Sequence, residues 1–289
     1  MAERDDQGRK HARRAPWLLL APGLLFLFFF FFFPLYTLFR MSLSASPTRF
    51  SDPVFHWQWS NYSNAFSQYG DQFYRSFEYA LAATLLALVI AYPLAYVIAF
   101  RGGRFKSVLL GLVVVPFFTN FLIRTLAWKT ILGDQGVVVW LLRDVGILGS
   151  SGTLLRTPIA VIGGLTYNFL PFMVLPIYVA LEKIDPRLID AARDLYSNTW
   201  RAFRKIVFPL SLPGVFAGSL LVFIPAAGDF VNAYYLGSAK TTMIGNVVQN
   251  QFLVQVDYPV AAALSFVFMA IVMVIVIVYA RILGTEDLA

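Results

Sequence analysis

The sequence predicts an all-α membrane protein with six transmembrane helices, and three observations lead to this prediction. Hydrophobic residues make up 58% of the 289 residues, charged residues make up only 13%, and the mean hydropathy is +0.67. Few soluble proteins combine these values. Apolar runs that reach the length of about 20 residues needed to cross a bilayer recur along the chain. One strongly charged stretch, residues 182–205, interrupts this apolar sequence.

The composition excludes several classes of function. The chain has no cysteine, which rules out disulfides, thiolate metal sites and thiol nucleophiles. Its two histidines, His11 and His56, lie in a basic tail and in a predicted connection, which disfavours a histidine metal site or a membrane-embedded hydrolase. The net charge of +7 fits the Lys/Arg excess of cytoplasmic loops. No basic run has the character of a nucleic-acid surface, so we expect no nucleic-acid partner. From the missing cysteines and the positions of the histidines we expect no metal site.

Six apolar segments are the predicted spans. In chain order they are Trp17–Phe39, Ala80–Phe100, Val108–Trp128, Ile159–Leu181, Ser211–Val231 and Val260–Ala280. The first is predicted to remain uncleaved, because it is longer than a signal-peptide core and is followed by no small-residue cleavage site. Its six consecutive phenylalanines, Phe28–Phe33, are expected to face lipid. The third is the least regular, since Thr119, Asn120 and Arg124 interrupt its second half.

The distribution of Lys and Arg predicts the orientation of these spans. Basic residues are dense in the N-terminal tail, in the RGGRFK connection and in the charged stretch. Because cytoplasmic loops carry this excess, both termini and the charged stretch are placed in the cytoplasm. The predicted organisation is a cytoplasmic basic tail over 1–16, a single transmembrane domain over 17–283 that includes a loop at 182–209, and a cytoplasmic tail over 284–289.

The connections on the opposite side are long. Residues 40–79 are interpreted as a loop rich in aromatic and amide groups, in which Trp57, Trp59 and Tyr62 suit a membrane–water interface. Residues 133–158 contain the turn sequences GDQG and LGSSG around VVVWLLRDVGIL. This apolar piece is too short to span a bilayer, so an interfacial or re-entrant helix is expected there.

The charged stretch has the pattern of two short amphipathic helices separated by a break. Asp185-Pro186 is typical of a helix start, with Asp as the cap and Pro at the first helical position. Asn198 and its neighbours can cap a second helix that runs into Pro209. Such a helix pair suits a groove in a soluble partner. It also suits the bilayer surface, although the acidic residues mixed among the basic ones favour the partner.

In the same stretch Asp190-Ala191-Ala192 is followed by Tyr196, Ile206 and Pro209. This spacing resembles the cytoplasmic EAA loop of ABC importer permeases, which reads Glu-Ala-Ala, three residues, Gly, nine residues, Ile, two residues and Pro. Asp shortens the reach of the usual Glu, and Tyr replaces the usual Gly. A Tyr in a left-handed conformation costs roughly 1–2 kcal/mol, so the break is expected at Ser197-Asn198 instead.

Two further segments, Phe117–Leu132 and Ile224–Ala263, are similar to the spermidine/putrescine branch of that family. The resemblance implies a MetI-like bundle with a cytoplasmic coupling helix pair, located in the bacterial inner membrane. The residues it implies for coupling to an ATPase are Asp190, Ala191, Ala192, Asp194, Tyr196, Ile206 and Pro209. The implied partners are a second homologous permease, two ATPase subunits, an extracytoplasmic solute-binding protein and membrane lipid.

The chain has no G-x-x-x-x-G-K-[ST] phosphate loop. We therefore expect ATP and Mg²⁺ to be used by the separate ATPase subunit, this chain to bind no cofactor, and the chain itself to be no enzyme. The implied function is polyamine translocation by alternating access. An iron, sulfate or phosphonate-type cargo is the alternative within the family, and an ion-coupled secondary transporter is the alternative from another class.

The candidate substrate-pathway residues are polar or aromatic groups in and beside the fourth and fifth spans. They are Tyr167, Asn168, Asp229, Asn232, Tyr234 and Tyr235. An ionisable residue within a span costs about 2.5–3.5 kcal/mol on insertion scales, so Asp229 is the principal candidate. A carboxylate beside aromatic rings suits a polyamine cation. Two structural alternatives stay open for Asp229: an ion pair with a cation such as Arg124, or a cap on the next segment.

Two further acids are interpreted as structural. Glu78 is taken as a solvated residue at the outer start of the second span. Asp257 precedes a predicted helix and is taken as its cap.

Overall fold

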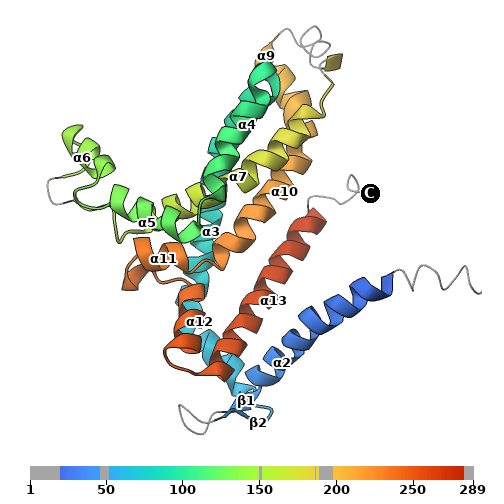
Figure 1. Cartoon of the computed structure of the whole chain (residues 1–289), viewed down its shortest axis with the longest axis vertical. Helices are drawn as coiled ribbons and strands as arrows, with labels where there is room; N and C mark the ends of the chain where they lie inside the picture. Colours follow the sequence, from blue (N-terminus) through green and yellow to red (C-terminus); the bar gives the residue numbers. More distant parts are fainter. Residues whose placement is uncertain (1–19, 46–51, 150–151, 186, 189–197, 283–289) are drawn as a thin grey trace, which may run out of the picture. The chain divides into compact units, whose positions relative to one another are not determined.

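The structure is a computed structural model that describes residues 20–45, 52–149, 152–185, 187–188 and 198–282. The chain forms two compact units, and each is presented by itself. Unit 1 comprises residues 1–68 and 251–267, and unit 2 comprises residues 69–250 and 268–289. The colours of Figure 1 follow the chain through both units.

Unit 1 contains the first span and a small hairpin. The span is helical over Leu20–Ser42 and includes the π-helix η1 (Phe28–Phe32) and α2 (Phe33–Ser42). Each side chain of Phe28–Phe33 is more than half exposed, as expected for a lipid-facing surface. The strands β1 (Ser44–Ala45) and β2 (Val54–Phe55) pair antiparallel. Asn61 Nδ2 donates to the carbonyls of Ser42 (3.0 Å) and Ser44 (2.9 Å), which ties the hairpin to the next helix.

Most of unit 2 is helical. Its main helices are α3 (Ser60–Arg101), α4 (Lys106–Val114), α5 (Phe121–Ile131), α7 (Pro158–Glu182), α10 (Phe208–Ala227) and α13 (Tyr258–Ile282). Of these, α3 and α13 also contribute residues to unit 1. Short elements connect them: η2 (Gly103–Phe105), η3 (Val115–Phe118), α6 (Val137–Asp144), α9 (Thr199–Ala202), η4 (Phe203–Val207), α11 (Val231–Leu236), η5 (Ala239–Thr241) and α12 (Ile244–Leu253).

The number of predicted spans is confirmed. In the described ranges, five helices are long and apolar enough to cross a membrane, and a bent pair, Gly103–Phe118 with Phe121–Ile131, makes a sixth if it counts as one span. The predicted fourth and sixth spans agree with α7 and α13 to within two residues at each end. The apolar piece between the third and fourth spans forms the predicted short helix, α6.

Small residues let the helices of unit 2 pack closely. Alanines spaced three or four apart form a fully buried stripe along α3: Ala80, Ala83, Ala87, Ala91 and Ala95. On α10, a Cβ added to Gly214 would come within 2.5 Å of the Pro176 carbonyl oxygen on α7. Such side chains allow two backbones to approach without the bulk that would separate them. The close α7–α10 crossing therefore depends on glycine at this position.

The second span begins much earlier than predicted. Residues 60–79 were expected to belong to a loop, but α3 is helical from Ser60, with one non-helical residue at Tyr69 (φ −120°, ψ 17°). Hydropathy marks only the part of a helix that needs an apolar solvent, so the polar first turns gave no signal. As a consequence Glu78 lies in the interior of a helix, not at the start of one, which corrects the earlier interpretation.

The third span is broken, and its prediction as one continuous segment over Val108–Trp128 was wrong. Its two parts meet at 94°. Thr119 (ψ 149°) and Asn120 (ψ 133°) are extended, and Asn120 Oδ1 accepts from the N–H groups of Leu122 (2.9 Å) and Ile123 (3.4 Å). Pro116 cannot donate to the preceding turn, and the Asn cap starts a new helix in a new direction.

The second helix predicted in the charged stretch is not a separate element. Asn198 Oδ1 accepts from the Trp200 N–H at 2.9 Å, so the predicted cap is confirmed. The helix then continues through α9, η4 and α10 as far as Ala227. Pro209 does not end it. The π turn just before Pro209, in which Phe208 N–H donates to Phe203 O, accommodates a residue that has no N–H of its own.

Candidate substrate-pathway site

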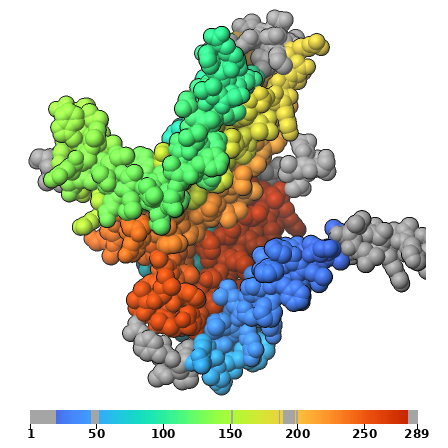
Figure 2. Space-filling view, viewed as in Figure 1, coloured from blue at the N-terminus to red at the C-terminus, as the bar shows by residue number. Residues whose placement is uncertain are grey.

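Three helices of unit 2 meet around the candidate site. α5 follows the bend of the third span, α7 is the fourth span, and α11 follows the fifth. Figure 2 shows α5 (green) lying directly against α11 (orange) on one face of unit 2. The loop 228–230 between α10 and α11 carries Asp229 to this junction.

A chain of hydrogen bonds joins the three helices. Asn168 Nδ2, on α7, donates to Thr125 Oγ1 on α5 at 3.2 Å and to Asn232 Oδ1 on α11 at 2.9 Å. The backbone N–H of Asn232 in turn donates to Asp229 Oδ1 at 2.7 Å. Three of the predicted site residues, Asn168, Asn232 and Asp229, therefore lie in one connected polar network.

This network is buried. Thr125, Asn168 and Asn232 are fully shielded from solvent, and Asp229 is 7% exposed. Asn168 Oδ1 has no hydrogen-bond partner among the described residues. Buried polar groups in membrane helices are costly and mark functional positions. The junction is thus a polar seam within a largely apolar bundle, and it keeps some unused hydrogen-bonding capacity.

The structure decides between the two structural alternatives for Asp229. Arg124 does not pair with it: Arg124 Nη1 donates to the Pro116 carbonyl at 3.1 Å, and its guanidinium lies 5.4 Å from the centroid of the Phe117 ring. The ion-pair hypothesis is therefore wrong. Asp229 instead caps α11 through Asn232, as the other alternative predicted. The predicted cap role of Asp257 is also confirmed, since its Oδ1 accepts from the Val260 N–H at 3.3 Å.

The predicted tyrosines are more exposed than the buried network, and they belong to two different ring pairs. Tyr167 is 36% exposed and Tyr234 is 68% exposed. Tyr167 packs edge-on against Trp128 at 5.2 Å, and Tyr234 packs against Tyr235 at 5.1 Å. Lys129 Nζ lies 5.9 Å from the centroid of the Tyr235 ring. A cation of the chain itself thus occupies one ring face that was expected to serve a substrate.

Residues on α5 were missed as members of the site. Thr125, Trp128 and Lys129 all contact predicted site residues. The sequence placed Thr125 and Trp128 in a straight span and Lys129 just beyond it, where their spacing points to no common partner. Recognising the break at Asn120 would have revealed them, because it turns α5 against the middle of α7 and against α11. In the described ranges, no three His, Cys, Asp or Glu side chains are grouped as a metal site requires.

The predicted coupling residues are described only in part. Asp190, Ala191, Ala192, Asp194 and Tyr196 lie outside the described residues. Ile206 is half-buried within η4, and Pro209 is exposed.

The edges of the loop that holds these residues are fixed by caps and aromatic packing. Asp185 Oδ1 accepts from the Arg187 N–H at 2.9 Å, as predicted for a helix start. Beyond the loop, Phe203 in η4 packs edge-on against Tyr92 of α3 at 5.8 Å. The Tyr92 hydroxyl lies 2.8 Å from Ser211 Oγ on α10. The segment that leaves the loop is therefore packed directly onto a membrane-length helix.

Membrane-length helices around a buried polar seam define the class of the protein, a multi-span helical membrane protein. The family described as "Binding-protein-dependent transport system inner membrane component" matches residues 83–284. The chain belongs to this family, and the resemblance drawn from its sequence is confirmed.

Curated relatives and a solved structure agree with this assignment. The chain is 42% identical over 222 residues to the spermidine/putrescine transport system permease protein PotB of Haemophilus influenzae, which covers 76% of this chain and 78% of that protein. It is 41% identical over 206 residues to PotB of Escherichia coli, covering 71% and 75%. A bacterial ABC transporter for alginate import has a chain with a TM-score of 0.70 at 18% identity, covering 98% of this chain and 99% of that one. The last comparison shows the fold alone.

Proposed function

We propose that this chain is the permease subunit of an ATP-driven importer that moves polyamines across the bacterial inner membrane. The observation that carries the proposal is the identity of 41–42% to permeases named for spermidine and putrescine, extending over most of both chains. The buried carboxylate of Asp229 supports a cationic cargo. It disfavours an anionic one, because an anion would be repelled at the same junction.

Asp229 serves two roles in this proposal. One carboxylate oxygen caps α11, and a carboxylate offers about four lone-pair sites, so capacity remains for an ammonium group. Because Asp229 is buried in this conformation, the cargo reaches it only when the α5–α7–α11 junction opens. Alternating access supplies that opening.

Membership of the family supports a set of partners. The proposed assembly contains a second homologous permease, two ATPase subunits that bind ATP and Mg²⁺, and an extracytoplasmic solute-binding protein. Both termini and the loop 182–209 face the cytoplasm, as the Lys/Arg distribution favours. The loop docks into the ATPase, and the helix through η4 and α10 transmits the movement to α3 by way of Phe203 and Tyr92.

The carboxylate is tested by a matched pair of variants assayed for polyamine uptake. Asn is as good a helix cap as Asp, so Asp229→Asn keeps the cap and removes only the charge. We expect uptake at least tenfold below wild type with normal expression. Asp229→Ala removes cap and charge together, and should also lower expression. Equal loss of uptake and expression in Asp229→Asn would assign Asp229 a purely structural role.

Docking is tested by co-purification with the ATPase. Asp190→Lys and Ala191→Arg should abolish the association with the ATPase while membrane insertion stays normal. As a matched control, Lys129→Glu changes a charge far from the loop in sequence and should leave association intact. Normal complexes with both loop variants would refute docking through this loop.

A further inference from the structure

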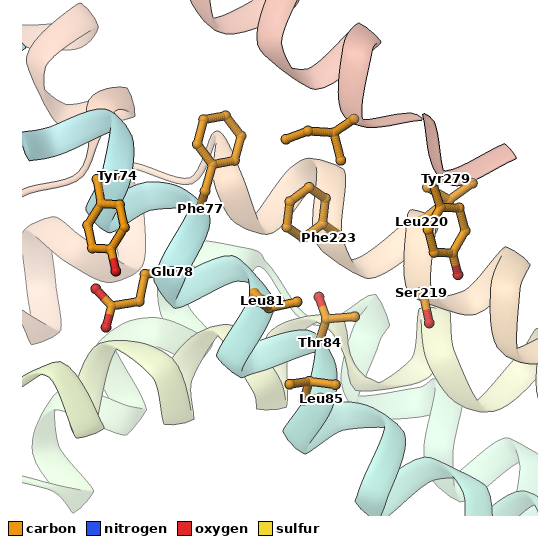
Figure 3. Close-up of a pocket in the computed structure, with 11 residues that line it drawn as sticks. Tyr74, Phe77, Glu78, Leu81, Thr84, Leu85, Ser219, Leu220, Phe223 and Tyr279 are labelled. Carbon is orange, nitrogen blue, oxygen red and sulfur yellow. The ribbon is translucent and has the colours of Figure 1, made fainter. Parts of the chain in front are cut away.

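A second site lies away from the candidate pathway, in a cleft of about 540 Å³ between α3, α10 and α13. All of its lining residues belong to unit 2. Figure 3 shows the residues as sticks: Tyr74 and Glu78 lie at one end, and Ser219 and Tyr279 lie at the other. Nothing in the proposed transport function uses this cleft.

The middle of the cleft is apolar. The rings of Phe77 on α3 and Phe223 on α10 stack at 6.2 Å and form one wall. Leu81 and Leu85, one turn apart on α3, are 53% and 54% exposed along it. The walls belong to membrane-length helices and are apolar. A ligand that matches them is therefore apolar over most of its own length.

On the acyl side of Glu78 the cleft covers part of one bilayer leaflet. Its lining on α3 from Glu78 to Leu85 is about 10 Å long at 1.5 Å per residue. Half of a hydrocarbon core of about 30 Å is about 15 Å, so the cleft can hold the part of an acyl chain nearest the headgroup.

The cleft carries one charge, and it lies at one end. Glu78 is exposed, no described Lys or Arg forms an ion pair with it, and no basic side chain lines the cleft. Two hydroxyls of the lining are already bonded to the protein (Figure 3): in the middle Thr84 Oγ1 donates to the Ala80 carbonyl at 2.7 Å, and at the other end the Tyr279 hydroxyl donates to the Phe216 carbonyl at 3.5 Å. The occupant therefore needs a cation at one end only.

We propose that this cleft binds a phospholipid with an ammonium headgroup, with one acyl chain between α3, α10 and α13 and the ammonium at Glu78. A polyamine does not satisfy the same geometry. Its further ammonium groups would lie in the apolar part without a carboxylate, at a cost of about 2.5–3.5 kcal/mol each on insertion scales. A single-headed amphiphile places its only cation at the only anion.

The absence of cysteine from the sequence makes a clean fluorescence test available. The full chain carrying Leu85→Cys is labelled with bimane and reconstituted with its partners into vesicles of unbrominated lipid. A small fraction of either phosphatidylethanolamine or phosphatidylglycerol with brominated acyl chains is then added as the quencher. We expect roughly twofold to fivefold stronger quenching by the ethanolamine lipid, the range of an exposed ion pair.

Two variants assign the preference to the carboxylate. Glu78→Gln should reduce the preference to about one, whereas Asp71→Asn, an exposed acid on the same helix outside the cleft, should leave it unchanged. Equal quenching by the two lipids in the parent protein would overturn the proposal. Quenching at a lipid-facing control, Val97→Cys, without quenching at Leu85→Cys would also overturn it, since a protein segment would then cover the cleft.

Discussion

The buried amide network makes a prediction that can be worked out quantitatively. Asn168→Leu keeps the approximate volume of the side chain and removes both of its hydrogen bonds, to Thr125 and to Asn232. Hydrogen bonds between membrane helices average about 0.6 kcal/mol, so the two bonds contribute about 1.2 kcal/mol. Leaving the buried Asn232 Oδ1 unpaired adds about 1 kcal/mol or more. The expected loss of unfolding free energy is about 2 kcal/mol, roughly a 30-fold change in the unfolding equilibrium.

A double-mutant cycle separates the network from simple packing. Asn232→Leu should cost a similar amount, whereas the double variant should cost less than the sum of the two, because no orphaned amide remains. We expect a coupling energy between about 0.5 and 2 kcal/mol. The assay is equilibrium unfolding in mixed micelles, followed by fluorescence of the native tryptophans.

Thr166→Val is the matched control. Thr166 is also buried on α7, but its hydroxyl donates to the carbonyls of Ile162 (2.8 Å) and of Ala83 on α3 (3.5 Å), outside the network. It should show no coupling to Asn232→Leu. Additive effects of Asn168→Leu and Asn232→Leu within about 0.3 kcal/mol would refute the network as a stabilising unit.

Three further predictions concern helix geometry. Gly214→Val should destabilise the fold by about 1–3 kcal/mol through overpacking against Pro176, measured as a lowered unfolding midpoint; an unchanged midpoint would contradict the close crossing. Asn120→Ala should cost about 1 kcal/mol by loss of the α5 cap, and Asn120→Asp should restore it. Arg124→Leu leaves the Pro116 carbonyl without its side-chain donor and should change the interspin distance between labels on α4 and α5, whereas Arg124→Lys should largely preserve it; equal distances in all three proteins would count against a bracing role.

The parts of the fold that follow from hydropathy were predictable. The fourth and sixth spans are uninterrupted apolar runs, and their predicted ends agree with α7 and α13. The first turns of α3 were not, because a helix that extends beyond the hydrocarbon needs no apolar run. The break at Asn120 depends on a local competition between a continued helix and an Asn cap, and a sequence window averages over both.

The site was predictable as a set of residues but not as an arrangement. Asp229, Asn168 and Asn232 stood out because polar groups are rare in apolar segments, and the structure joins them. Their distances depend on how α5 and α11 cross α7, which periodicity within single helices does not contain. For the same reason the sequence could not show that Arg124 forms no ion pair with Asp229, because this depends on the hydrogen bond from Arg124 to the Pro116 carbonyl.

Uptake of labelled spermidine into proteoliposomes tests the central claim most directly. The permease is reconstituted with its partner permease, the binding protein and the ATPase. Uptake is then measured with ATP supplied or omitted on the side of the membrane that the loop 182–209 faces. The proposed mechanism predicts uptake only when ATP and an active ATPase are both present, independent of imposed ion gradients. Uptake by the permease pair alone, driven by a proton or sodium gradient, would contradict it.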